Sequence, residues 1–252
     1  EKLGKSLDTV SIEDLAPADE FHIGGRPASI HLCDQLKLAE NHHVLDVGCG
    51  IGGPARFVAS EYQCHVTGVD LTQEYVETGN TLNEWVGLQT QVSLHQGSAL
   101  SMPFDACNFE AGYMMHVGMN IEDKQALYAE ISRVMKPGST FAIYDIMRFG
   151  DEALTYPVPW SSVAETSFVT NPDTYKQALE SAGFEIVAET NRRDFALEFF
   201  KALRERTAAA GGPPPLGLQL VMGSNAPTKI QNLVGNITKG GVAPVEIIAR
   251  KS

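Results

Sequence analysis

The stretch of sequence that decides the fold is a short apolar run followed at once by glycines, Val44-Leu45-Asp46-Val47-Gly48-Cys49-Gly50-Ile51-Gly52-Gly53. The apolar run predicts a buried strand over 44–47, and the early proline of the next segment predicts a helix over 54–60. Glycines at such a strand-to-helix turn let the backbone pass close to a ligand, because a Cβ there would clash with it. This turn is therefore the first candidate for a ligand-binding site.

Strands and helices alternate along the rest of the chain. Further strands are predicted over 64–69, 92–95, 109–115, 140–146, 184–189 and 242–249, with helices over 73–88, 123–135, 172–181, 194–210 and 228–239. This alternation is typical of an α/β fold with a doubly wound, mostly parallel sheet, here of seven strands, that binds ligands beyond the carboxyl ends of its strands. We expect a single domain over 1–252, with an N-terminal helical lid over 1–42 and a cofactor-binding core over 43–147. Residues 148–252 would supply a substrate-side loop, a helical insertion before the last strand and the closing strands.

Composition excludes several classes of protein. The 252 residues are 43% hydrophobic, and 19 basic against 31 acidic residues give a net charge of −12, which disfavours a nucleic-acid partner. The four cysteines form no Cys-x-x-Cys pair, so we expect no metal site and no disulfide framework. No apolar run approaches the roughly 20 residues that span a bilayer, and the start of the sequence lacks a signal-peptide core. We therefore expect a cytoplasmic protein without a membrane partner.

The glycines fit two known kinds of ligand loop. Gly48, Gly50 and Gly53 spell the G-x-G-x-x-G of dinucleotide binding, whereas Gly48, Gly50 and Gly52 spell the G-x-G-x-G of S-adenosylmethionine enzymes. Asp46 favours the second, because a carboxylate beside the loop would repel a pyrophosphate and attract a methionyl ammonium group. Asp70, at the end of the second strand, can accept hydrogen bonds from the ribose hydroxyls of either cofactor.

A set of ordered motifs between about Val44 and Asp145 resembles the class I S-adenosylmethionine-dependent methyltransferases. The motifs are Val44-Leu45-Asp46-Val47-Gly48-Cys49-Gly50, Gly68-Val69-Asp70, His95-Gln96-Gly97-Ser98-Ala99, Met102-Pro103-Phe104 and Arg133-Val134-Met135-Lys136-Pro137-Gly138. Two short strings, Met119-Asn120-Ile121 and Tyr156-Pro157-Val158-Pro159-Trp160, are similar to the sarcosine/dimethylglycine methyltransferase-like branch of that superfamily. The resemblance implies a Rossmann-like methyltransferase fold and S-adenosyl-L-methionine as the cofactor.

The resemblance also implies which residues would hold the cofactor. Asp46 would lie near its amino group, and the loop residues that border its methionine part and adenosine would be Gly48, Cys49, Gly50 and Gly52. Asp70 and Leu71 would hold the ribose, the adenine edge would meet Gly97, Ser98 and Ala99, and His116 would face the cofactor. The family usually has Asp where this chain has Ser98. A hydroxyl is a weaker acceptor than a carboxylate, so we expect weaker cofactor binding.

The expected reaction mainly requires that the protein align the acceptor atom with the methyl group. Methyl transfer from a sulfonium is an in-line displacement whose leaving group needs no proton, so positioning in a dry site can supply most of the catalysis. An amine acceptor needs only its neutral form, whereas a ring carbon or a phenol usually needs a base. The candidate catalytic residues are His116, Tyr113 and Asp145, with His22 as a further candidate base. The competing interpretations are a histidine that only packs against the cofactor and, for Asp145, an aspartate that caps a turn.

Aromatic side chains from separate regions are expected to line the substrate pocket. They are Phe21, His22, Tyr156, Trp160 and Phe199, with Tyr113 close by. Aromatic faces suit a methylated ammonium, at about 0.5–2 kcal/mol per contact, and suit a flat aromatic substrate equally well. Gly24-Gly25 supplies flexibility, so we expect residues 17–30 to form a lid over the cofactor.

We therefore expect methyl transfer from S-adenosylmethionine to a small molecule, with an amine such as a glycine derivative as the leading acceptor. C- or O-methylation of a ring compound, of the quinone or phenol type, is the main alternative chemistry. Two further alternatives are an NAD-dependent oxidoreductase, which the G-x-G-x-x-G register would support, and a catalytically silent binding protein, which Ser98 would support. A homodimer is the default assembly for such a chain.

Overall fold

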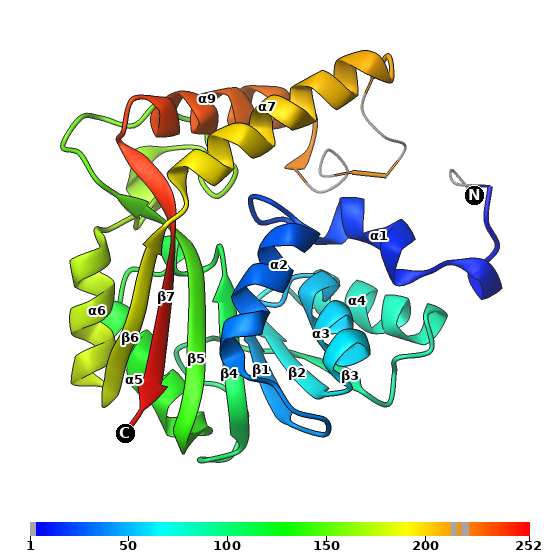
Figure 1. The fold of residues 1–252 in the computed structure, drawn as a ribbon, viewed down its shortest axis with the longest axis vertical. Coiled ribbons are helices and arrows are strands. Elements are labelled where there is room, and N and C mark those ends of the chain that lie inside the picture. Colours follow the sequence, from blue (N-terminus) through cyan, green and yellow to red (C-terminus); the bar gives the residue numbers. More distant parts are fainter. Residues whose placement is uncertain (1–3, 213–215, 218–221) are drawn as a thin grey trace.

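A seven-stranded sheet forms the centre of the molecule. The computed structural model describes residues 4–212, 216–217 and 222–252. Its strands are β1 (His43–Val47), β2 (His65–Asp70), β3 (Val92–Gln96), β4 (Phe109–Met115), β5 (Met135–Arg148), β6 (Phe184–Asn191) and β7 (Val242–Lys251). They follow the order β3-β2-β1-β4-β5-β7-β6, in which β1 to β5 run parallel and β7 runs antiparallel to β5 and β6 (Figure 1). The predicted doubly wound, mostly parallel α/β sheet is confirmed.

Helices cover both faces of this sheet, as Figure 1 shows. The helices on one face are α2 (Arg26–Cys33), α3 (Gly53–Tyr62) and α4 (Gln73–Trp85), and those on the other are α5 (Lys124–Val134) and α6 (Pro172–Ser181). Strand β5 shows the consequence for the sequence. Its Tyr144 packs into the core on the first face, while Ile143 and Met147 pack into the core on the second. Because successive strand residues point to opposite faces, a strand covered on both sides is apolar along most of its length.

Two helices before the last strand lie across the carboxyl end of the parallel strands. They are α7 (Arg193–Ala209) and α9 (Ala226–Thr238), which contact each other and β7 (Figure 1). A third apolar cluster, which we call the insertion cluster, joins them to the N-terminal segment and to the turn after β4. Its buried members are Ile23, Met119, Ile146, Ala196, Phe200, Leu233, Ile237 and Val242.

The N-terminal segment folds over the same end of the sheet. It contains α1 (Ile12–Asp19) and α2, and the chain between them carries Glu20, Phe21 and His22. Helix α1 contacts α3, which follows the glycine loop. The residues expected to act as a lid are therefore placed beside that loop, while their movement stays a prediction.

A few element boundaries differ from expectation. Strand β5 begins at Met135 rather than Thr140, because Met135 already pairs with Phe109 and a register shift follows before Ala111. Helix α4 ends at Trp85 rather than Leu88, since Gly87 adopts a positive φ of 72° that stops the helix. Neither difference moves a residue of the candidate site.

None of the helices in the described ranges is both long and hydrophobic enough to cross a bilayer. Within the same ranges, no three or more His, Cys, Asp or Glu side chains gather in a way that could hold a metal ion.

Candidate active site

The glycine loop leaves β1 and bends back toward β2 through backbone hydrogen bonds. The amides of Gly48 and Cys49 donate to the Val69 carbonyl at 2.8 and 3.1 Å. Gly48 has a φ of +74°, and a Cβ on it would overlap the side chain of Val117, which follows β4. Because of both its φ and this close approach, the first position of the loop requires glycine.

Asp46 lies at the base of this loop and is almost fully buried. The Tyr113 hydroxyl donates to its Oδ2 at 3.0 Å. Burial raises the pKa of Asp46 to about 7, the Tyr113 hydrogen bond lowers it in part, and the nearby carboxylate of Asp70 raises it further. A bound cation would favour the ionised form, so this carboxyl is suited to pair with an ammonium group.

The hydrogen bond to Asp46 fixes the side chain of Tyr113. This residue lies inside β4, fully buried, with its hydroxyl committed to Asp46. The prediction that Tyr113 takes part in catalysis needs its hydroxyl to reach a substrate, and the structure instead places it where it orients Asp46.

Asp70 connects the loop to the end of β2. Its Oδ2 accepts the Gly50 amide and its Oδ1 accepts the Thr72 amide, both at 2.9 Å. The Asp70 carboxylate thus caps the next turn and also supports the glycine loop. Leu71, beside it, is 71% exposed, which leaves an apolar side chain at the position where the resemblance places the nucleoside.

The turn that carries Ser98 follows β3 and lies next to Asp70. The Gly97 amide donates to the Asp70 carbonyl at 2.9 Å. The Ser98 hydroxyl oxygen accepts the Leu100 amide at 3.2 Å, and Ala99 packs against the core under α5 and α6. Ser98 therefore keeps its hydroxyl hydrogen and one lone pair for another partner.

His116 follows the last residue of β4. It has a φ of +56°, and its amide donates to the Tyr144 carbonyl at 2.7 Å. Its ring meets the Tyr144 ring edge-on, with centroids 4.8 Å apart. Both ring nitrogens are buried, and no described residue hydrogen-bonds to either one. Burial, with a smaller contribution from His22, lowers the pKa of His116 to about 3, so the ring is neutral.

The N-terminal segment brings two aromatic rings to this place. A Cβ on Gly50 would lie 3.6 Å from the Phe21 ring, so Phe21 covers the glycine loop. The His22 ring lies 6.3 Å from that of His116, centroid to centroid. The Tyr144 hydroxyl donates to the Ile23 carbonyl at 3.0 Å and fixes this segment against β5.

A buried ion pair holds the segment to the helix after the glycine loop. Arg56 of α3 donates to the Asp19 carboxylate at 2.6 Å, with both side chains almost fully buried. It also donates to the carbonyl of Ile51 within the loop at 2.8 Å. Burial raises the pKa of Asp19, and the charge of Arg56 opposes that rise.

The remaining predicted pocket residues do not all come together. Trp160 and Phe199 pack against the insertion cluster, and the Trp160 indole donates to the Ser167 hydroxyl at 2.9 Å. Tyr156 is not part of that cluster. It precedes Pro157, whose carbonyl accepts the Asn232 amide of α9 at 2.9 Å.

Asp145 points to the face of the sheet that α5 and α6 cover. Strand β5 continues past it to Arg148. Its Oδ2 accepts the Tyr175 hydroxyl of α6 at 2.7 Å. Since neighbouring Tyr144 faces His116, the alternation of the strand turns Asp145 away from it. Burial raises the pKa of Asp145 to about 7, and the Tyr175 hydrogen bond lowers it in part. A catalytic role for Asp145 stays a prediction.

The sequence analysis did not single out the buried polar residues that support the N-terminal segment, which are Glu20, Ser29 and Arg56. It did not single out Tyr144 either. Glu20, Ser29 and Arg56 are buried although their types are usually exposed, and no local pattern marks such a residue before its partner is known. Tyr144 carried a usable signal, because an aromatic near the carboxyl end of a central strand lies where ligands bind in this architecture.

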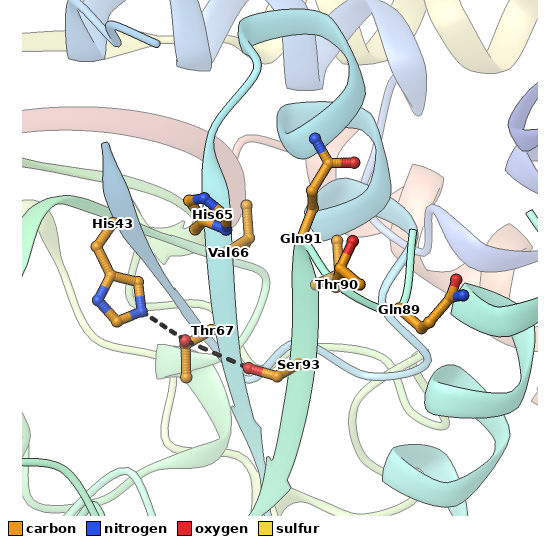
Figure 2. A pocket seen from close by; sticks show the side chains of 9 residues that line it. His43, His65, Val66, Thr67, Gln89, Thr90, Gln91 and Ser93 are labelled. Carbon is orange, nitrogen blue, oxygen red and sulfur yellow. Dashed lines mark hydrogen bonds between the residues drawn. The ribbon is translucent and has the colours of Figure 1, made fainter. Parts of the chain in front are cut away.

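A hollow of about 410 Å³ lies at the amino ends of β1 and β2, opposite the glycine loop (Figure 2). His43 and His65, the first residues of β1 and β2, line it together with Ser93. His43 Nε2 is 2.7 Å from the Thr67 hydroxyl, which is 3.4 Å from that of Ser93. This hollow is at the amino ends of the strands, away from the glycine loop, so it is distinct from the candidate active site.

The comparison with protein families identifies the core of the chain. Residues 44–138 match the family model described as a methyltransferase domain. The core of this chain is therefore similar to methyltransferase domains. A solved structure with this fold, a geranyl diphosphate methyltransferase, contains S-adenosylmethionine. The residues here would fit that molecule, because Gly48 leaves no room for a Cβ, a buried carboxyl lies at the base of the loop and an exposed leucine follows Asp70.

The curated relatives are named as C-methyltransferases. A 24-methylenesterol C-methyltransferase of Arabidopsis thaliana is 35% identical over 112 residues, which cover 44% of this chain and 31% of that protein. A sterol 24-C-methyltransferase of Debaryomyces hansenii is 29% identical over 171 residues, covering 65% of this chain and 45% of the relative. The chain thus spans less than half the length of these two relatives.

Solved structures share the fold at low identity. A geranyl diphosphate C-methyltransferase from Streptomyces coelicolor, crystallised with S-adenosyl-L-homocysteine, matches with a TM-score of 0.73 and 19% identity over 90% of this chain and 78% of that one. A putative sarcosine dimethylglycine methyltransferase from Galdieria sulphuraria matches with a TM-score of 0.72 and 19% identity over 90% of this chain and 86% of that one. Identities this low establish the shared fold and leave the acceptor open.

Proposed function

We propose that this chain transfers a methyl group from S-adenosylmethionine to a small molecule whose reacting atom lies beside His116 and His22. The observation that carries the proposal is the pair of buried nitrogens on His116, to which none of the described residues is hydrogen-bonded. His116 follows β4, and its neighbour Val117 meets Gly48 of the glycine loop. A buried polar atom without a partner costs stability, so such an atom indicates a ligand that completes it. When bound, the cofactor supplies an electrophilic methyl group.

The proposed cofactor-binding residues lie in the glycine loop and at the ends of β1 and β2, and they are Asp46, Gly48, Gly50, Gly52, Asp70 and Leu71. Further proposed contacts at the edges of the site are Cys49, Gly97, Ser98 and Ala99. The chain's own contribution is to hold the cofactor still and to keep water out. Phe21 supports both roles, since its ring covers Gly50. Alignment of this kind can supply a large part of the rate of a displacement reaction.

The acceptor atom that the geometry favours is a carbon in a largely apolar molecule. Burial lowers the pKa of His22 to about 4, as it lowers that of His116. An imidazole this weakly basic can accept a proton from a carbocation, which is a strong acid, but it cannot take the proton of a phenol, whose pKa is about 10. The insertion cluster, which reaches this place through Ile23 and Met119, is apolar. The curated relatives named as C-methyltransferases agree with a carbon acceptor.

The amine of a glycine derivative is the second candidate acceptor. It is supported by the fold likeness to the putative sarcosine dimethylglycine methyltransferase and by the strings at 119–121 and 156–160. The Trp160 ring in the insertion cluster could face a methylated ammonium. Such an acceptor would enter as the neutral amine and would need no base.

Methyl transfer to a panel of acceptors tests the proposal. Purified protein is incubated with S-adenosylmethionine and, separately, unsaturated apolar alcohols and diphosphates, sterols, phenols, glycine, sarcosine and dimethylglycine. Release of S-adenosylhomocysteine and the mass of the product are recorded. Turnover with an unsaturated apolar acceptor supports the proposal, and turnover with amines alone supports the second candidate. Cofactor binding without transfer to any acceptor would overturn both and favour a silent binding protein.

A further inference from the structure

The hydrogen bonds around His22 allow one neutral form of its ring. Nε2 lies 3.0 Å from the Gly25 carbonyl oxygen, which can only accept, so Nε2 must carry the hydrogen. The same nitrogen lies 3.0 Å from the Ser29 hydroxyl oxygen. Ser29 gives its own hydrogen to Glu20 at 2.8 Å and can therefore only accept from His22. The neutral ring is left with a lone pair on Nδ1, to which no described residue is hydrogen-bonded.

Behind His22 stands a buried carboxylate. Glu20 Oε2, which accepts from Ser29, is 3.8 Å from His22 Nε2. The other oxygen, Oε1, accepts Arg26 Nε at 2.5 Å. His22, Glu20 and Ser29 are all almost fully buried. If Nδ1 took up a proton, the positive charge of the ring would be stabilised through Ser29 by the Glu20 carboxylate.

His116 offers no comparable arrangement. Neither of its nitrogens has a partner among the described residues that would fix the hydrogen, and its ring meets the rings of His22 and Tyr144 rather than a carboxylate. A proton on His116 would be a bare buried charge beside His22, which costs far more than a paired one. Of the two rings, His22 is the one built to hold a proton for the lifetime of a reaction step.

We propose that His22, through Nδ1, accepts the proton that leaves the acceptor after methyl transfer, and that Ser29 and Glu20 are positioning residues for it. This inference rests on the proposed function. In the step, the π electrons of the acceptor form the bond to the methyl carbon, while the electron pair of the sulfur–methyl bond stays on sulfur. The adjacent carbon–hydrogen bond then breaks, its electrons form the new double bond, and the proton goes to Nδ1.

The charged and titratable groups that face His22 come from four elements. Asp19 and Glu20 belong to the end of α1, Arg26 to α2, His116 to the turn after β4 and Tyr144 to β5. Desolvation is the largest cause of the low pKa of His22. The Gly25 hydrogen bond raises that pKa, the charge of Arg26 lowers it, and the charge of Asp19 raises it. The Glu20 carboxylate nevertheless lies where it can steady the protonated ring.

The tautomer can be measured without turnover. In protein labelled with ¹⁵N-histidine, with His22→Gln used to assign the signal, we expect His22 to show the neutral Nε2–H form at neutral pH. An Nδ1–H form would overturn the inference, because Nδ1 could then not accept a proton. This measurement holds whether or not the acceptor is known.

Turnover variants test the role itself. Glutamine keeps an N–H for the Gly25 carbonyl but has no basic nitrogen, so His22→Gln should lower kcat about 10²- to 10⁴-fold while S-adenosylhomocysteine binding stays near wild type. His116→Gln should cost much less, and His65→Gln, at the far edge of the sheet, should cost nothing. A His22→Gln enzyme with the wild-type kcat would overturn the inference and leave the proposed function standing. Absence of transfer by the wild type would overturn the proposed function.

Glu20→Gln separates a positioning role from a purely structural one. Removal of the carboxylate should lower the kcat plateau and move the acid limb of the kcat–pH profile to lower pH, because a protonated His22 loses its stabilising charge. Ser29→Ala should move the limb in the same direction by a smaller amount. A lower plateau with an unmoved limb would mean that Glu20 only supports the fold, and would overturn its assignment.

Discussion

The two halves of the candidate site are built in different ways. The cofactor half is made from backbone groups of one continuous region: the Gly48 amide bonds to Val69, and the Gly50 amide bonds to Asp70. The proposed acceptor half is made from side chains that come from distant segments, with His22 before α2 and His116 after β4. The first half is therefore fixed by a short motif, whereas the second depends on how the whole chain packs.

A few contacts join the two halves. A Cβ on Gly53, the first residue of α3, would overlap the Asp19 carbonyl of the N-terminal segment. Arg56, one turn further along, pairs with the Asp19 carboxylate and also donates to Ile51 in the glycine loop. The placement of His22 over the site thus depends on the helix that follows the cofactor motif.

The largest effect is expected from Arg56→Met. The change leaves the Asp19 carboxylate buried without its partner, and loss of one member of a buried pair costs about 3–5 kcal/mol. We expect the free energy of unfolding to fall by that amount in denaturant titrations. Lys5→Met is the control, because Lys5 is 43% exposed in its pair with Asp14 and its loss should cost less than about 1 kcal/mol. Equal losses in the two variants would mean that the junction is not a buried ion pair.

Gly48→Ala should have the next largest effect, on cofactor affinity. Gly48 and Gly138 both have a positive φ, of 74° and 78°, so alanine at either position costs about 1–2 kcal/mol of backbone strain. Only at Gly48 would the new Cβ also overlap Val117, since nothing lies near Gly138. Calorimetric titration with S-adenosylhomocysteine should show at least tenfold weaker binding for Gly48→Ala and unchanged binding for Gly138→Ala. Unchanged binding in both would remove the glycine loop from the site.

Asp46→Asn tests the electrostatic basis of the cofactor half. The pKa of Asp46 is raised to about 7 in the free protein, and pairing with an ammonium requires the ionised form. Wild-type affinity for S-adenosylhomocysteine should therefore rise as the pH increases from 6 to 8 and fall as it drops below 7. An asparagine side chain cannot ionise, so the variant should bind about tenfold more weakly at pH 8, or about 1.4 kcal/mol, with a flatter dependence on pH. Parallel pH profiles for the two proteins would show that Asp46 does not meet the ammonium group.

The contrast between the halves also explains what could be predicted from the sequence. All seven strands and the positions of Asp46, Gly48 and Asp70 follow from apolar periodicity and from a loop whose geometry is local. The catalytic roles expected of Asp145 and Tyr113 stay predictions. The motif gives the strand but not the partner that each side chain meets, and those partners are Tyr175 and Asp46.

The acceptor half resisted prediction for a related reason. The polar group behind His22, made of Glu20 and Ser29, has no recognisable sequence spacing, because it forms only when α2 packs onto the sheet. Trp160 and Phe199 were expected in one pocket and do share the insertion cluster, but Tyr156, in the same string as Trp160, does not join it. Contacts between remote segments are fixed by packing, and a single sequence reports that packing poorly.

The smallest predicted effect concerns Ser98, the position where the cofactor half departs from the methyltransferases that it resembles. Ser98 stands where a carboxylate is usual, and a charge-assisted hydrogen bond is stronger than a neutral one by about 1 kcal/mol. Ser98→Asp should therefore tighten S-adenosylhomocysteine binding about fivefold. Added negative charge alone could attract the ammonium group of the ligand, so Ser101→Asp, which places the same charge on the residue bridged to Ser98, is the control. Tighter binding in Ser98→Asp alone would assign that side chain to the adenine edge. Tighter binding in both variants would indicate a general electrostatic effect. Unchanged binding in both would mean that Ser98 lies outside the site.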